Sequence, residues 1–209
     1  PDVLRLLLDI RAFNEGARTF WCWMSLLMDL KDYDPDPESQ QRAEDYLALL
    51  TPVMKAYFTD RGLKATIDGQ QVLGGSGYVE EWGMSQYVRD ARIAMIYEGA
   101  NGIQALVLVG RKLGANGGRG IQAFFKEVGD FCEENRDNEQ MSFFTKYLKK
   151  GLNDLQQATM WFVQNAMAKP DNAGAGSHDY MHLFGLVALG YMWGLQVKAA
   201  QETLAAGAN

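Results

Sequence analysis

The carboxylate of Glu98 is the first candidate for chemistry, because it lies in the short segment Ile96-Tyr97-Glu98-Gly99 between two stretches of helical patterning. A carboxylate in a turn, beside a glycine that leaves room for a ligand, can remove a proton as a general base. An acid at this position can also stabilise the amino end of the following helix, expected over 102–113, through the helix dipole. Taken alone, the segment favours the second role.

A second candidate is the glycine-rich turn Gly74-Gly75-Ser76-Gly77, which Gln71 precedes. Glycine allows a backbone to approach a phosphate or a ring closely, and it also ends helices. An isolated turn of this composition is usually a helix end. The two roles are compatible at one turn.

His178 and His182 are four residues apart and would share one face of a helix, which is a spacing that metal ligands use. Asp179 follows His178, and no third ligand is evident from the sequence. We therefore expect a structural or solvent-exposed role for this pair, and no metal site. The segment 114–120 is rich in glycine but lacks the Lys-Ser/Thr of a phosphate-binding loop, so we expect a linker there.

The composition is that of an ordinary soluble globular protein, with 47% hydrophobic and 22% charged residues in a chain of 209. A net charge of −6 without a Lys/Arg run argues against nucleic-acid binding. Cys22 and Cys132 form no CxxC pair, which indicates a reducing compartment, either the cytoplasm or the mitochondrial matrix. The longest apolar runs are too short to span a membrane. Because Pro1 opens the sequence within helical patterning, we expect a piece of a longer protein.

Apolar spacings of three and four predict an all-α chain without internal repeats. We expect helices at about 1–31, 38–73, 84–94, 102–113, 121–135, 139–168 and 178–205, with a loop at 170–176. Residues 1–113 and 121–209 are predicted to be two helical units, joined by the linker 114–120.

Short motifs follow one another over residues 71–104 in a fixed order. They are Gln71-Val72-Leu73-Gly74-Gly75-Ser76-Gly77-Tyr78, Arg89-Asp90-Ala91-Arg92, Ile96-Tyr97-Glu98-Gly99 and Ile103-Gln104. In this order and spacing they resemble the carboxy-terminal signature of the acyl-CoA dehydrogenases, which carry a Gln-x-x-Gly-Gly-x-Gly turn, an Arg-Asp-Ala step and a Tyr-Glu-Gly-Thr turn. Residues 1–113 then resemble the family's four-helix up-down bundle. Residues 121–209 resemble the helical extension of the 3-methylmercaptopropionyl-CoA dehydrogenase-like branch.

The resemblance implies a flavoenzyme that dehydrogenates an acyl-CoA between its α and β carbons. Glu98 would be the catalytic base, with Tyr97 and Gly99 beside the substrate. FAD would be the cofactor, contacted by Gln71, Gly74 and Gly75 of a neighbouring subunit. The family also implies a homo-oligomer and electron-transfer flavoprotein as acceptor. The 209 residues alone are expected to be inactive, because the family's other domains are absent from them.

Two positions depart from the family pattern. Ala100 replaces the usual threonine, and Gly102 replaces a polar residue, so only their backbone is expected to contact the dinucleotide. Two alternatives to an enzyme stay open. One is a helical oligomerisation module, and the other is a DNA-binding member of the same fold, which the acidic net charge disfavours.

Overall fold

The computed structural model describes residues 1–166 and 168–207, and within them it contains helices and no strand, which confirms the all-α prediction. The α-helices have the following bounds: α1 Asp2–Tyr33, α2 Pro37–Val72, α3 Gly75–Tyr78, α4 Met84–Ala94, α5 Asn101–Val107, α6 Arg119–Glu134, α7 Ser142–Asn165 and α8 Pro170–Ala205. Shorter turns connect them: the 3-10 turns η1 (Glu80–Trp82) and η3 (Ala115–Gly118), and the π-helical turn η2 (Leu108–Lys112).

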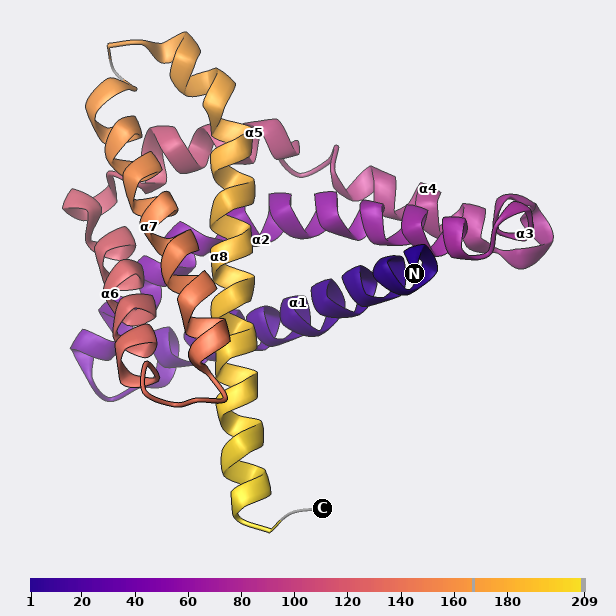
Figure 1. The fold of residues 1–209 in the computed structure, drawn as a ribbon. Coiled ribbons are helices and arrows are strands. Elements are labelled where there is room, and N and C mark those ends of the chain that lie inside the picture. Colours follow the sequence, from indigo (N-terminus) through magenta and orange to yellow (C-terminus); the bar gives the residue numbers. More distant parts are fainter. Residues whose placement is uncertain (167, 208–209) are drawn as a thin grey trace.

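α1 and α2 form a long antiparallel hairpin that makes one arm of the molecule (Figure 1). The turn between them is stabilised at the start of α2, where the Asp36 carboxylate accepts a hydrogen bond from Glu38 N at 3.0 Å and Pro37 occupies the first turn. α2 continues through Pro52 as a single helix. At the tip of the arm α3 reverses the chain, and α4 returns along α2 (Figure 1).

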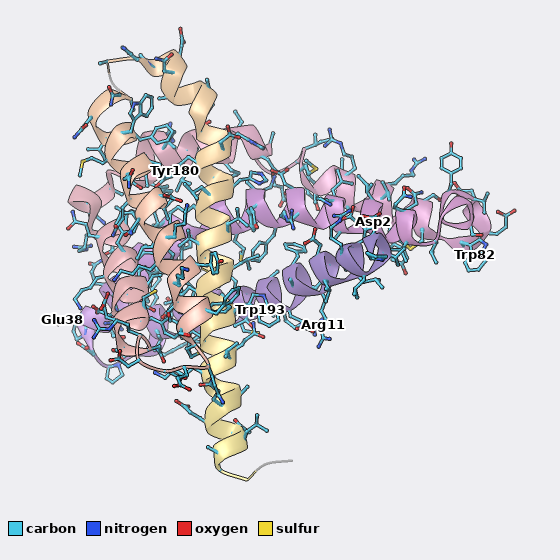
Figure 2. All side chains as sticks on the ribbon, in the orientation of Figure 1. Asp2, Arg11, Glu38, Trp82, Tyr180 and Trp193 are labelled. Atoms are coloured by element: carbon cyan, nitrogen blue, oxygen red, sulfur yellow. The ribbon has the colours of Figure 1, made fainter. Side chains whose placement is uncertain are left out.

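α6, α7 and α8 lie together at the other end of the arm, where α8 crosses α1 and α2 (Figure 1). Trp193 of α8 lies against α1 (Figure 2), and its Nε1 donates to Ala12 O at 2.9 Å. The largest fully buried side chains come from both halves of the chain, including Phe20 and Tyr57 of the first half and Phe124 and Phe184 of the second. These residues belong to one continuous apolar core.

The expected loop at 170–176 is wrong, because α8 begins at Pro170 and runs through the whole segment. Pro170 is suited to the first helical turn, where its missing N–H has no intrahelical partner in any case. The small residues that follow let this part of the helix pack closely against the core, and Ala173 and Ser177 are both buried. The glycines and proline that indicated a loop are therefore a helix start and a close packing surface.

The glycine-rich segment 114–120 forms a tight turn between η2 and α6. Asn116, Gly117 and Gly118 have φ of 51°, 68° and 78°, in the left-handed region. Asp45 of α2 holds this turn by accepting hydrogen bonds from Asn116 Nδ2 at 3.2 Å and Arg119 Nη2 at 2.9 Å. That the segment separates two domains stays a prediction.

α8 is long and apolar enough, by length and composition alone, to cross a bilayer, and 44% of its most apolar stretch is buried. The core helix of a soluble protein passes the same test, so this is weak evidence. The expectation that the chain does not contact a membrane stays a prediction.

Candidate functional site

The turn that carries Glu98 connects α4, which ends at Ala94, to α5, which begins at Asn101. Glu98 has φ of 52° and Gly99 has φ of 88°. A non-glycine residue in the left-handed region is uncommon, and such strain is typical of functional sites. The side chains of Tyr97 and Glu98 are exposed, and 52% of Tyr97 is accessible.

α2 fixes the backbone of this turn through Lys55. Its Nζ donates to Gly99 O at 2.7 Å and to the side-chain oxygen of Asn101 at 2.8 Å. The backbone N–H of Asn101 also donates to Met95 O at 3.1 Å, which closes the turn from within. The carbonyl of Gly99 is therefore held toward α2, while Glu98 is left on the exposed side.

Asn101 is buried and forms the centre of a polar network. Its Nδ2 lies 2.8 Å from Thr59 Oγ1, 3.1 Å from Ala56 O and 2.6 Å from Asp60 Oδ1. Buried polar groups are expensive unless their hydrogen bonds are made, so this network holds α5 and α2 in a single arrangement.

The network continues into α8, because Asp60 Oδ2 lies 2.8 Å from His182 Nε2. Burial raises the pKa of Asp60, but the hydrogen bonds from His182 and Asn101 outweigh it, so the pKa lies below its usual value. An ionised Asp60 thus connects the Glu98 turn to the carboxy-terminal helix through Asn101.

The helix-stabilising alternative for Glu98 has no hydrogen bond to support it. α5 has Ala100 as its N-cap, with no side-chain cap and no acid in its first turn. Among the hydrogen bonds and ion pairs of residues 1–166 and 168–207, none uses the Glu98 carboxylate. A carboxylate held on a strained and anchored turn, with its own oxygens uncommitted, can accept a proton from a bound substrate.

The predicted site residues fall into two groups within one chain. Tyr97, Glu98, Gly99, Ala100 and Gly102 lie together in the turn and the start of α5. The second group, Gln71, Gly74 and Gly75, lies at the tip of the arm beyond the far end of α4 (Figure 1). The eleven residues of α4 span about 16 Å between the two groups, so the two groups of a single chain do not meet.

The tip leaves backbone exposed where a cofactor is expected. Gly74 has φ of 58°, and no atom lies within 4 Å of a Cβ placed on Gly74 or Gly75. By contrast, a Cβ on Gly77 would lie 2.3 Å from Gln70 O, so Gly77 serves the packing of the turn itself. The open space beside Gly75 is not needed by the fold, and it fits the close approach of a dinucleotide.

Comparison with known proteins gives two family matches along the chain. Residues 38–113 match the acyl-CoA dehydrogenase C-terminal domain, and residues 124–209 match the acetyl-CoA dehydrogenase C-terminal-like domain. The 3-methylmercaptopropionyl-CoA dehydrogenase of Ruegeria pomeroyi is 33% identical over the whole of this chain and 36% of its own length. The chain belongs to the acyl-CoA dehydrogenase family. The family predicted from the motifs at Gln71 and Glu98 is thereby confirmed.

A second relative supports the same assignment, and a solved structure has the same fold. The broad-specificity linear acyl-CoA dehydrogenase FadE5 of Mycobacterium tuberculosis is 26% identical over the whole chain and 35% of its own length. The structure of Caenorhabditis elegans ACDH-11 in complex with C11-CoA has a TM-score of 0.70 at 18% identity, covering 90% of this chain and 32% of that one. The chain thus spans about a third of the length of these acyl-CoA dehydrogenases.

The residues that anchor the Glu98 turn were not found from the sequence. Lys55 and Thr59 are four apart and so share one face of α2, which is a signal a sequence could offer. Asp60 gives no such signal, because its partners Asn101 and His182 are 41 and 122 residues away. Only the fold shows that these groups meet.

Proposed function

We propose that this chain is the carboxy-terminal part of a flavin-dependent acyl-CoA dehydrogenase, in which Glu98 removes the α-proton of the acyl-CoA thioester. The observation that carries the proposal is the left-handed φ of Glu98, in a turn fixed by Lys55 and Asn101. The Glu98 carboxylate makes no hydrogen bond or ion pair within the described part of the chain, and backbone strain at such a residue is expected where the residue serves a substrate.

In this proposal the turn supplies two groups to the thioester. The Glu98 carboxylate accepts the α-proton, and its own backbone N–H donates to the thioester oxygen, where negative charge develops. Tyr97, which is half exposed, packs beside the thioester. FAD, when bound, takes the hydride from the β carbon.

FAD is expected to be contacted by the two groups of residues from different subunits. The dinucleotide beside the Glu98 turn of one subunit would contact Gln71, Gly74 and Gly75 of another subunit. Within a single chain, α4 keeps these two groups of residues apart. Ala100 and Gly102 offer only backbone to this contact. Electron-transfer flavoprotein as acceptor and a cytoplasmic or mitochondrial location remain expectations of the family resemblance.

The test replaces Glu98 by glutamine in the full-length protein that contains this chain. Removing a general base lowers turnover by about 10²–10⁴-fold, and we expect Glu98→Gln to do so while the absorbance of bound flavin is unchanged. Glu139→Gln is the matched control, because Glu139 is exposed in the turn between α6 and α7. Turnover of Glu98→Gln near that of the control would show that Glu98 is not the base.

A second candidate function, self-association, is favoured by exposed apolar side chains on α1. Val3, Leu7, Trp21 and Met28 are 51%, 48%, 61% and 58% exposed. Their spacing places them on one side of the helix, which is the pattern of a helix that packs against a partner. We expect the full-length protein to sediment as an oligomer and Trp21→Glu to shift it toward the monomer. A monomeric wild type would exclude the proposal.

A further inference from the structure

Asp60, His178 and His182 form a cluster of potential metal ligands between α2 and α8. One atom of each lies within 4.8 Å of the others. Asp60 Oδ2 is the shared point: it lies 2.8 Å from His182 Nε2 and 3.4 Å from His178 Nε2. The two imidazole rings have their centroids 4.5 Å apart. A carboxylate from a distant part of the chain therefore supplies the third potential ligand beside the two histidines.

One distance in the cluster agrees with the distance between two ligands of a tetrahedral zinc site. Zinc binds imidazole nitrogen and carboxylate oxygen at about 2.0–2.1 Å, so two of its ligand atoms lie about 3.4 Å apart. The distance from Asp60 Oδ2 to His178 Nε2 has this value, at 3.4 Å. The distance to His182 is that of a hydrogen bond, and side-chain rotation of a partly exposed histidine would lengthen it.

The surroundings hold two of the ligands in place. Asp60 Oδ1 accepts from Asn101 Nδ2, which leaves Oδ2 directed at the histidines. The His182 ring packs edge-on against Tyr57, with ring centroids 5.4 Å apart. Hydrogen bonds to a ligating carboxylate orient it and strengthen metal binding. The fourth position would face solvent beside His178, whose side chain is 58% exposed.

We propose that Asp60, His178 and His182 form a binding site for a divalent transition metal, Zn²⁺ in the first place, which fastens α8 to α2. Two imidazoles and one carboxylate favour zinc, cobalt or nickel over magnesium and calcium, which prefer oxygen ligands. The metal would replace the hydrogen bond between His182 and Asp60 Oδ2 and the 3.4 Å approach of His178 to the same oxygen. Asn101 would connect it to the Glu98 turn. The proposal of this site does not rest on the proposed catalysis, and it revises the expectation from the sequence that no metal is bound.

The test measures Zn²⁺ binding by titration calorimetry on the full-length protein, stripped of metal with a chelator. We compare the wild type with His178→Ala, which removes an exposed side chain and leaves the buried Asn101 network untouched. Asp171→Asn is the control, because Asp171 is an exposed carboxylate on the same helix. Any other histidine of the full-length protein contributes equally to all three isotherms.

We expect one more equivalent of Zn²⁺ in the wild type and the control than in His178→Ala, or a loss of affinity of at least about tenfold in that variant. Zn²⁺ should also raise the melting temperature of the wild type more than that of His178→Ala, since a ligand of the native state stabilises it. Mg²⁺ should do neither. Identical isotherms for wild type and His178→Ala would overturn the site, whatever the activity of Glu98 variants.

Discussion

Glu98 combines two properties that conflict in an ordinary turn. Its backbone occupies the left-handed region, where a side chain costs about 1–2 kcal/mol, and its carboxylate makes no hydrogen bond or ion pair with the residues that the structure describes. Lys55 and Asn101 supply what holds it there, through Gly99 O and the buried amide network. The turn is therefore stabilised by its neighbours rather than by the residue that it presents.

Glu98→Gly should leave the protein as stable as the wild type or raise the free energy of unfolding by up to about 1 kcal/mol, because glycine relieves the left-handed strain but has a more flexible unfolded chain. Urea denaturation measures it. The expected gain in stability goes with the loss of the carboxylate that is proposed as the catalytic base.

Glu139→Gly is the control, since the φ of Glu139 is not positive. There the same change should lower the free energy of unfolding by about 0.5–1 kcal/mol. If Glu98→Gly lowers it as much as the control does, the Glu98 side chain contributes to the fold, and the strain argument for its function fails.

At the scale of elements, Asp45 joins α2 to the turn that leads into α6. It is 6% exposed, and its carboxylate accepts from Arg119 Nε, Arg119 Nη2 and Asn116 Nδ2. The Arg119 guanidinium is the main reason that the pKa of Asp45 lies below its usual value, while burial opposes the shift. Ionised Asp45 therefore stabilises the folded state.

The sign of this shift predicts a pH dependence. A carboxyl whose pKa is lower in the folded state stabilises the protein above its unfolded pKa, and this contribution is lost as the pH falls through its folded value. Asp45→Asn should therefore lower the urea midpoint at about pH 7 and have a smaller effect at about pH 3, which is below the ordinary pKa of an aspartate. Urea titrations of both proteins at the two pH values measure it.

The control for Asp45 is Asp154→Asn, which breaks an exposed i,i+4 pair with Lys150 at 2.7 Å. Exposed pairs contribute little, so the urea midpoint should change little at either pH. If Asp45→Asn behaves like this control, the Asp45 cluster does not anchor the turn.

The elements also show how far a sequence can be interpreted. Local signals placed α4 at 84–94, with a glycine-rich turn on one side and the Glu98 turn on the other, and the structure has the same bounds. The loop predicted at 170–176 is wrong, because glycine and proline indicate a loop only when the segment is taken in isolation. In the fold, the small residues of this segment lie against the core as part of a helix. Asp60 could not be predicted, because its role depends on helices that meet only in the fold.

At the scale of the whole molecule, α8 joins the two halves of the chain by crossing α2. Gly185 lies at this crossing, and a Cβ placed on it would lie 2.2 Å from Cγ of Tyr57. Tyr57 is 1% exposed, and Cγ is the base of its ring, so the ring cannot swing away. The backbones of α2 and α8 approach here as closely as glycine permits.

Gly185→Ala should therefore lower the free energy of unfolding by about 1–3 kcal/mol, as overpacking of a dense core does. Gly62→Ala is the matched control, because Gly62 lies inside α2 with no atom within 4 Å of its missing Cβ. That change should stabilise the protein by about 0.5–1 kcal/mol through helix propensity. Urea denaturation with tryptophan fluorescence measures both, and equal effects of the two substitutions would contradict the packing argument.

The shape of the unfolding curve then bears on the two predicted units, 1–113 and 121–209. Tyr57 belongs to the first unit and Gly185 to the second, while Trp82 and Trp161 lie in one unit each and can be followed separately in variants that keep a single tryptophan. If the continuous core makes the chain a single cooperative structure, Gly185→Ala shifts one transition, and both tryptophans follow it. If the units are separate domains, the substitution loosens their contact, and the curve divides into two transitions. A single shared transition would mean that the extension stabilises the bundle, and with it the Asp60–Asn101 contact that holds the Glu98 turn.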